Sequence, residues 1–226
     1  MGQMAVRSVL ILAAMQMEAN AVADALQLPR PGPAKPSRGS VGGVEVSIER
    51  IGIAAKRLPD GQLDRRPDVV LLAGLSGALD PSLEVGQIVV EDSIDSMGIQ
   101  LSHRQGPLES GDQIISTPRQ KSELFRTTGA LAFDMESGIV RAWAQRHQLK
   151  YLAVRSISDR ADQTVVPEVV GWVDQWGRPR IGSVLVSLLR KPGLINHLRR
   201  LAVDSKAAAR SLGAAVREII LHLGRQ

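Results

Sequence analysis

Apolar residues occur in short continuous runs at several points of the chain. The runs at 6–15, 68–73 and 151–157 contain many β-branched residues and show no regular exchange of polar and apolar positions. Such runs are typical of strands that are buried on both faces of a sheet. Shorter strands are predicted at 44–48, within 83–94 and at 130–133.

Between these runs, apolar positions recur with the spacing of an α-helix. Helices are predicted at 18–28, 117–127, 135–147, 181–189 and 194–223. Thr117 and Pro118 suit the N-cap and the first position of the second helix. Ile139, Ala142 and Trp143 form the predicted inward face of the third. Because strands alternate with helices and no linker divides the chain, we expect a single three-layer α/β domain over residues 1–226.

Proline, glycine and serine interrupt the pattern at three places. Residues 29–43 are predicted to form a loop, and Pro59 and Gly61 keep any helix within 54–66 short. The strand at 68–73 runs into small residues at 74–78, which we interpret as a tight turn. Glycines there could let a ligand approach the backbone, but their spacing fits neither a dinucleotide fingerprint nor a Walker loop. A purely structural turn explains the segment equally well.

Composition limits the chemistry that the chain can carry out. With 226 residues, of which 44% are hydrophobic, it can bury a large core, and the absence of cysteine excludes disulfides, thiolate nucleophiles and zinc–thiolate sites. No cofactor or metal is expected, because metal-ligand spacing is missing among His103, His147, His197 and His222. A cytoplasmic location is expected, because no apolar run reaches the roughly 18 residues of a membrane span and residues 1–15 lack a clear signal cleavage site.

Positive charge concentrates near the C-terminus. The net charge is +5, yet residues 176–226 hold ten basic and two acidic side chains. In the helix at about 194–223 the basic residues lie off the apolar stripe, a pattern that suits peripheral contact with a membrane, another polyanion or plain solvent. Nucleic acid is disfavoured, because the chain has only six aromatic residues and none alternates with the basic ones.

Three acidic residues follow predicted strands. Glu18 comes after the first strand, Glu136 after the strand at 130–133, and Asp159 after the strand at 151–157. In open α/β sheets, ligands bind beyond the carboxyl ends of the strands. Carboxylates gathered there could stabilise a cationic sugar carbon and protonate a leaving group. Each one alone could equally be a helix-start carboxylate that the helix dipole favours.

Five short segments are more specific than the pattern around them. They are Ala-Met-Gln-Met-Glu at 14–18, Gly-Leu-Ser-Gly-Ala-Leu-Asp-Pro at 74–81, Ser-Gly-Asp-Gln at 110–113, Asp-Met-Glu-Ser at 134–137 and Ser-Asp-Arg-Ala-Asp at 158–162. In this order they resemble the superfamily of purine nucleoside phosphorylases and methylthioadenosine/S-adenosylhomocysteine nucleosidases. The tail resembles, more weakly, the branch of hopanoid-associated phosphorylases. The resemblance implies a mixed central sheet, cleavage of the N-glycosidic bond of a purine nucleoside and a homo-oligomer.

The resemblance also assigns roles to residues. It implies that Asp159 protonates or hydrogen-bonds the purine N7, that Glu136 holds the ribose hydroxyls and that Glu18 activates the attacking water. The remaining substrate-binding residues that it implies are Met135 and Ser158, the backbone of Leu75, Ser76 and Gly77, and Ile114 and Ile115 beside the base. Ile114 stands where the family often has an aromatic residue, a role that Trp172 or Trp176 could take instead.

Water and phosphate both remain as the nucleophile. Phosphate would need cationic donors, for which Arg50, Lys56 and Arg155 are the candidates, without a recognisable spacing. Glu18 favours a nucleosidase of the methylthioadenosine/S-adenosylhomocysteine type, which hydrolyses a 5′-substituted adenosine. The tail favours phosphorolysis, with adenosylhopane as one substrate and phosphate as co-substrate. A non-catalytic nucleoside-binding protein is the alternative from another class.

Overall fold

The chain alternates between strands and helices, as its sequence pattern predicts. The computed structural model describes residues 6–33, 35–59, 66–92, 103–165, 174 and 193–225. Its elements are β1 (Ser8–Ala13), α1 (Gln16–Leu26), β2 (Ser37–Val41), β3 (Val44–Arg50), the 3₁₀ turn η1 (Ile53–Ala55), β4 (Val69–Ala78), β5 (Ile88–Asp92), β6 (Arg104–Gln105), β7 (Leu108–Ser110), α2 (Pro118–Thr128), β8 (Ala132–Asp134), α3 (Ser137–Arg146), β9 (Lys150–Asp159) and α6 (Leu194–Leu223).

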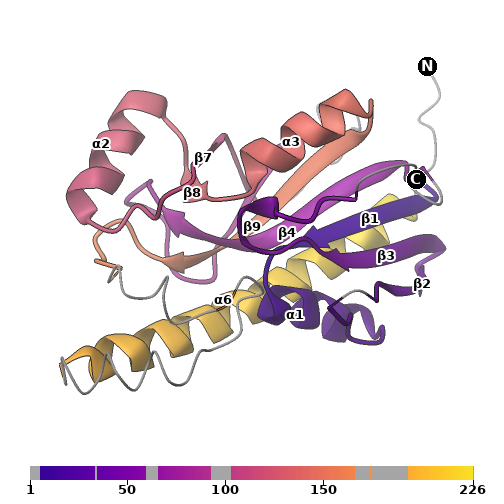
Figure 1. Ribbon diagram of the computed structural model, residues 1–226, viewed down its shortest axis with the longest axis horizontal. Helices are drawn as coiled ribbons and strands as arrows, with labels where there is room; N and C mark the ends of the chain where they lie inside the picture. Colours follow the sequence, from indigo (N-terminus) through magenta and orange to yellow (C-terminus); the bar gives the residue numbers. More distant parts are fainter. Residues whose placement is uncertain are drawn as a thin grey trace.

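A mixed sheet forms the centre of the molecule (Figure 1). Its strands lie in the order β2-β3-β1-β4-β9-β5-β6, and β3, β1, β4 and β9 are parallel. The strands β2 and β5 run antiparallel to their neighbours β3 and β9. β8 pairs antiparallel with the last residues of β4 and carries β7 at its side. The predicted mixed α/β architecture is therefore confirmed.

Helices cover both faces of the sheet (Figure 1). α1 and α6 lie below it in this view, while α3 lies above it, with α2 to one side. One buried cluster joins α1 and α6 to the sheet through Val22, Leu212 and Ile219, and the other joins α3 to the opposite face through Val140 and Trp143. The central strands β4 and β9 are apolar on both faces because both faces are covered. The single domain over 1–226 stays a prediction, since 166–173 and 175–192 lie outside the described residues.

Several local predictions are confirmed. Thr117 caps α2, where its hydroxyl accepts the amide N–H of Gln120 at 3.3 Å and the Gln120 side chain accepts the Thr117 amide at 3.1 Å. This reciprocal capping box satisfies donors that the first turn of a helix leaves open. α6 has the predicted bounds, and its stripe is buried from Ala208 onward. The predicted helix at 181–189 lies outside the described residues.

Other local predictions are wrong. The predicted loop at 29–43 contains β2, which forms a hairpin with β3 through Gly42 and Gly43, both at positive φ. Residues 74–78 are the end of β4, where 74–77 pair with β9 and Ala78 pairs with β8, so they are a strand and not a turn. Of the predicted inward face of α3, Trp143 is buried, but Ile139 is 44% exposed and Ala142 is exposed as well, because the helix begins at Ser137 and turns Val140 and Ala144 inward instead.

Candidate active site

A cavity of about 340 Å³ opens at the carboxyl ends of the parallel strands. Glu18, Glu136 and Asp159 all line it. Glu18 lies in the first turn of α1, directly after β1, and Asp159 is the last residue of β9. Glu136 is the N-cap of α3 and follows β8, which pairs with the end of β4. Parallel pairing of β1, β4 and β9 brings these distant segments to one edge of the sheet.

The other substrate-binding residues that the sequence predicts lie in the same cavity. They are Met135, Ser158, Leu75, Ser76, Gly77, Ile114 and Ile115. The three cationic candidates, Arg50, Lys56 and Arg155, are not among the described lining residues. Arg50 is buried and donates a hydrogen bond to the Gln16 side chain, whereas Lys56 is exposed.

Glu18 is buried, and backbone amides from two segments hold its two carboxylate oxygens. Its carboxylate oxygens accept the amide N–H of Met15 at 2.7 Å and that of Leu75 at 2.8 Å, so the side chain bridges α1 and β4. Only 1% of the residue is exposed. Burial, together with the nearby charge of Glu136, raises the pKa of Glu18 to about 7. A carboxyl group with such a pKa can take up a proton near neutral pH.

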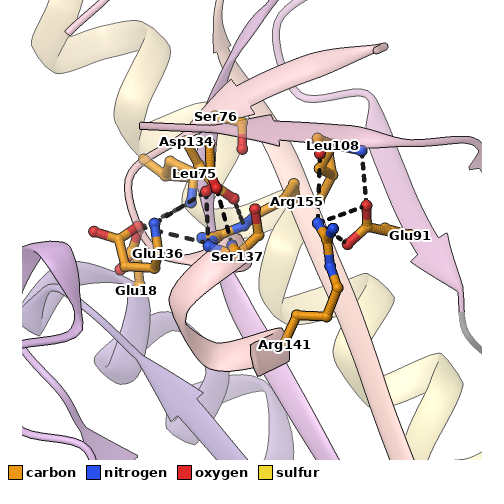
Figure 2. Close-up of polar contacts among 12 residues, drawn as sticks. Glu18, Leu75, Ser76, Glu91, Leu108, Asp134, Glu136, Ser137, Arg141 and Arg155 are labelled. Carbon is orange, nitrogen blue, oxygen red and sulfur yellow. Dashed lines mark hydrogen bonds and ion pairs between the residues drawn. The ribbon is translucent and has the colours of Figure 1, made fainter. Parts of the chain in front are cut away.

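Glu136 lies next to Glu18 and is held by a different set of contacts (Figure 2). One of its oxygens accepts the amide N–H of Ala54 at 2.9 Å, and the other lies 3.6 Å from the Arg155 guanidinium. Burial raises the pKa of Glu136, while Arg155 opposes that shift. The side chain thus presents a rigid, buried carboxyl group to the cavity.

Arg155 lies beside Glu136, with Glu18 on the other side of that glutamate (Figure 2). It is fully buried in β9, and its Nε lies 2.6 Å from Asp134 Oδ2. The other oxygen of Asp134 accepts the amides of Glu136 and Ser137 and so shapes the start of α3. A buried cation paired in this way supplies the counter-charge of the carboxylate cluster. Arg155 therefore supports the site through its ion pairs and is not one of the described residues that line the cavity.

Asp159 sits at the far end of the cavity. Its Oδ2 accepts a hydrogen bond from Lys121 Nζ at 2.5 Å, and its Oδ1 lies 2.7 Å from the hydroxyl of Ser158. That hydroxyl also lies 3.2 Å from the carbonyl of Ser76. A Cβ on Gly77 would stand 2.9 Å from Asp159 Oδ2, so glycine leaves room for the carboxylate beside β4.

Several residues that line the cavity were not predicted from the sequence, and three of them come from elements that hold none of the predicted site residues or add a new kind of side chain. Lys121 comes from α2, Phe133 from β8 and Leu201 from α6. Lys121 lies on the same helix face as Leu124 and Phe125, and this charged residue on an apolar face is the signal by which the sequence could have identified it. Ile114 lines the cavity without an aromatic ring, but Phe133 provides one in the cavity wall. Trp172 and Trp176, which were predicted as possible substitutes, lie outside the described residues. In the part of the chain that the structure describes, no group of three histidine or acidic residues could hold a metal ion.

A mixed sheet between helices, with buried carboxylates at the strand ends, defines the class of α/β enzymes that cleave nucleosides. The comparisons agree: the model of the Phosphorylase superfamily matches residues 93–190. A 5′-methylthioadenosine/S-adenosylhomocysteine nucleosidase from Thermotoga maritima is 30% identical in an alignment of length 151 that covers 54% of this chain and 69% of that protein. The chain belongs to the superfamily of nucleoside phosphorylases and nucleosidases, enzymes that cleave N-glycosyl bonds.

Solved structures show the same fold. The nucleosidase of this type from Neisseria meningitidis, in complex with methylthio-immucillin-A, matches with a TM-score of 0.67 at 16% identity and covers 96% of this chain and 100% of that one. Futalosine hydrolase from Helicobacter pylori matches with a TM-score of 0.60 at 17% identity, over 96% and 97% of the two chains. At these identities the likeness establishes the fold.

Proposed function

We propose that the protein hydrolyses the N-glycosidic bond of a 5′-substituted adenosine such as methylthioadenosine or S-adenosylhomocysteine. The observation that carries the proposal is the meeting of Glu18, Glu136 and Asp159 in one cavity of about 340 Å³. The names of the relatives support the choice of substrate class. Apolar side chains from Met17, Ile53 and Leu201 in the cavity wall also suit a thioether substituent.

The three carboxyl groups divide the chemistry of the reaction between them. As the bond between N9 and C1′ breaks, positive charge develops on the sugar, and the buried Glu136 is placed to stabilise it. The departing purine takes up a proton from solvent at N7, and Asp159 accepts the hydrogen bond from that N7–H. Glu18 takes a proton from the water that attacks C1′, a role that suits a pKa of about 7. The products are free adenine and a 5-substituted ribose, and the proposed steps use no cofactor.

Water is favoured over phosphate as the nucleophile by the charges around the cavity. Lys121 is the only basic residue among its described lining residues, and its ammonium is engaged by Asp159. Arg155 is engaged by Asp134 and Glu136. A phosphate dianion would therefore meet buried carboxyl groups without a guanidinium fork to hold it.

Base release from defined nucleosides tests the proposal. The protein is incubated with methylthioadenosine, S-adenosylhomocysteine, adenosine and inosine, with and without phosphate, and free base is measured. We expect adenine release from methylthioadenosine and S-adenosylhomocysteine. For each of these substrates the rate should be the same with and without phosphate. Release that requires phosphate would establish phosphorolysis instead, and no release from any of them would favour a protein that only binds nucleosides.

We also propose that the protein is a cytoplasmic homo-oligomer, an assembly that the superfamily resemblance supports. The described helices include none long and apolar enough to cross a membrane. Sedimentation velocity at micromolar concentration measures the assembly directly. A monomer under those conditions would contradict the proposed oligomer.

We propose that residues 195–207, in the first half of α6, make peripheral contact with a membrane. From Ala208 onward the apolar stripe packs against the sheet, whereas Ile195 and Val203 are exposed beside Arg199 and Arg200. Co-sedimentation with anionic phosphatidylglycerol vesicles should fall in the variant Arg199→Gln/Arg200→Gln and stay unchanged in Arg210→Gln/Arg217→Gln. Equal binding by both variants, or no binding by the wild type, would contradict the contact.

A further inference from the structure

α2 buries a lysine and no apolar residue. Of its eleven residues, only Lys121 is buried, with 1% of its surface exposed. Transfer of an ammonium group from water into a protein interior is costly unless the charge is paired and hydrogen-bonded. The buried ammonium of Lys121 therefore requires a partner whose interaction offsets this unfavourable free energy.

All three donors of the Lys121 ammonium point at oxygen atoms. Nζ donates to Asp159 Oδ2 at 2.5 Å, to the Arg160 carbonyl at 2.7 Å and to the Gln163 carbonyl at 3.2 Å. Asp159 contributes the only charge of the three. Because the ion pair is buried while Oδ1 still faces Ser158, Lys121 fixes one oxygen of the carboxylate and leaves the other beside the cavity.

We propose that Lys121 is a positioning residue for base release, acting through Asp159. The inference rests on the function proposed above. The departing purine takes up a proton from solvent at N7, and Oδ1 of the ion-paired Asp159 accepts the hydrogen bond from that N7–H. The ammonium at 2.5 Å from Oδ2 holds the carboxylate in its charged form, which favours the purine that carries a proton at N7, while Lys121 keeps its own proton.

Other charged groups near this pair lie at the surface. Asp162 follows Asp159 in the chain, but it is exposed and its carboxylate pairs with the Arg160 guanidinium at 2.9 Å. Arg160 itself reaches toward the exposed Glu84. Salt and solvent screen such exposed pairs, so Asp159 is the charge to which Lys121 responds most strongly.

Two inhibitors distinguish this role from a purely structural one, in which Lys121 only holds the loop 160–163 in place through its hydrogen bonds to the Arg160 and Gln163 carbonyls. A pyrrolo[3,2-d]pyrimidine nucleoside analogue carries a hydrogen at the position of N7, so its bound form matches an ionised Asp159. The corresponding 7-deazaadenine analogue has carbon at that position and forms no such hydrogen bond. Calorimetry gives the ratio of their dissociation constants without any turnover.

Replacement of Lys121 should change that ratio. In Lys121→Gln, whose amide can still reach the loop carbonyls, and in Lys121→Met, we expect the preference for the N7–H analogue to fall by about tenfold or more. In both variants kcat should fall far more than KM rises. Arg119→Gln removes the same charge from the exposed face of α2 and should leave the ratio and kcat unchanged.

A double-mutant cycle completes the test. In the Asp159→Asn background, Lys121→Gln should cause no further loss of preference for the N7–H analogue, because the carboxylate through which it acts is gone. Equal weakening of both analogues, or an unchanged ratio, would show that Lys121 only holds the loop. Failure of the wild type to cleave any nucleoside would refute the proposed function separately, because the inhibitor ratio does not depend on turnover.

Discussion

Burial gives Glu18 its chemical character. An exposed glutamate is ionised throughout the neutral range, but the hydrogen bonds to Met15 and Leu75 hold Glu18 inside the protein beside Glu136. Its pKa of about 7 therefore follows from its place in the fold and not from its neighbours in sequence. The sequence identified the residue, while its acidity depends on contacts from β4 and α3.

The rate should follow the ionisation of Glu18. Its protonated form, which dominates below its pKa, cannot accept a proton from water, so kcat/KM should rise with pH and level off above about 7. Glu18→Gln should lower kcat by roughly 10²–10⁴-fold and remove this limb of the profile. Glu123→Gln, at the exposed face of α2, serves as the matched control. A profile of wild-type rates that is flat from pH 5 to 8 would contradict the role of Glu18.

Gly74 has a role that its neighbours in sequence do not reveal. It lies inside β4, where a Cβ would overlap the guanidinium of Arg155 and stand 3.1 Å from Glu18 Oε1. Glycine at position 74 therefore leaves room for the buried Arg155 side chain against β4. The sequence suggested a different reason for this glycine, namely a tight turn.

Substitution at Gly74 should damage both folding and activity. Gly74→Ala forces Arg155 to move in a packed interior, which should lower the free energy of unfolding by roughly 1–3 kcal/mol. Gly193→Ala is the control, because a Cβ at Gly193 meets no atom of the described residues within 4 Å. Chemical denaturation measures both variants, and an unchanged stability in Gly74→Ala would show that Arg155 is not held as described.

At the scale of elements, α6 has two different halves. Its later half packs against the sheet and α1 through Leu212, Val216 and Ile219, while its first half extends past the sheet (Figure 1) and lines the cavity with Leu201 and Ser205. The apolar periodicity of the sequence continues through both halves. Only the tertiary contacts show where the helix stops being core and becomes cavity wall.

Alanine substitutions should separate the two halves. Leu212 is fully buried, so Leu212→Ala should lower the free energy of unfolding by roughly 2–5 kcal/mol. Val203 is 67% exposed, and Val203→Ala should change it by less than about 0.5 kcal/mol. Urea denaturation compares the two, and similar losses would contradict the division of α6.

At the scale of the whole molecule, ligand binding should stabilise the fold, because the cavity joins α1, β4, the segment after β8, β9 and α6. The pyrrolo[3,2-d]pyrimidine analogue at one hundred times its dissociation constant should add about 2.7 kcal/mol to the free energy of unfolding. Glu136→Gln should bind it more weakly and show a smaller rise at the same concentration. Thermal denaturation measures this effect, and an equal rise in wild type and variant would place the ligand elsewhere.

The sequence by itself determined the order of the main elements, the α/β class and ten residues that line the cavity, eight of them within the family motifs, because apolar periodicity and short motifs are local properties. The hairpin of β2, the continuation of β4 through residues 74–78 and the exposure of Ile139 were decided by strand pairing and by the exact start of α3. Tertiary structure alone placed Lys121 against Asp159 and Arg155 beside Asp134 and Glu136. The physical reason is that the state of a charged side chain depends on burial and on partners distant in sequence, and these exist only once the sheet has formed.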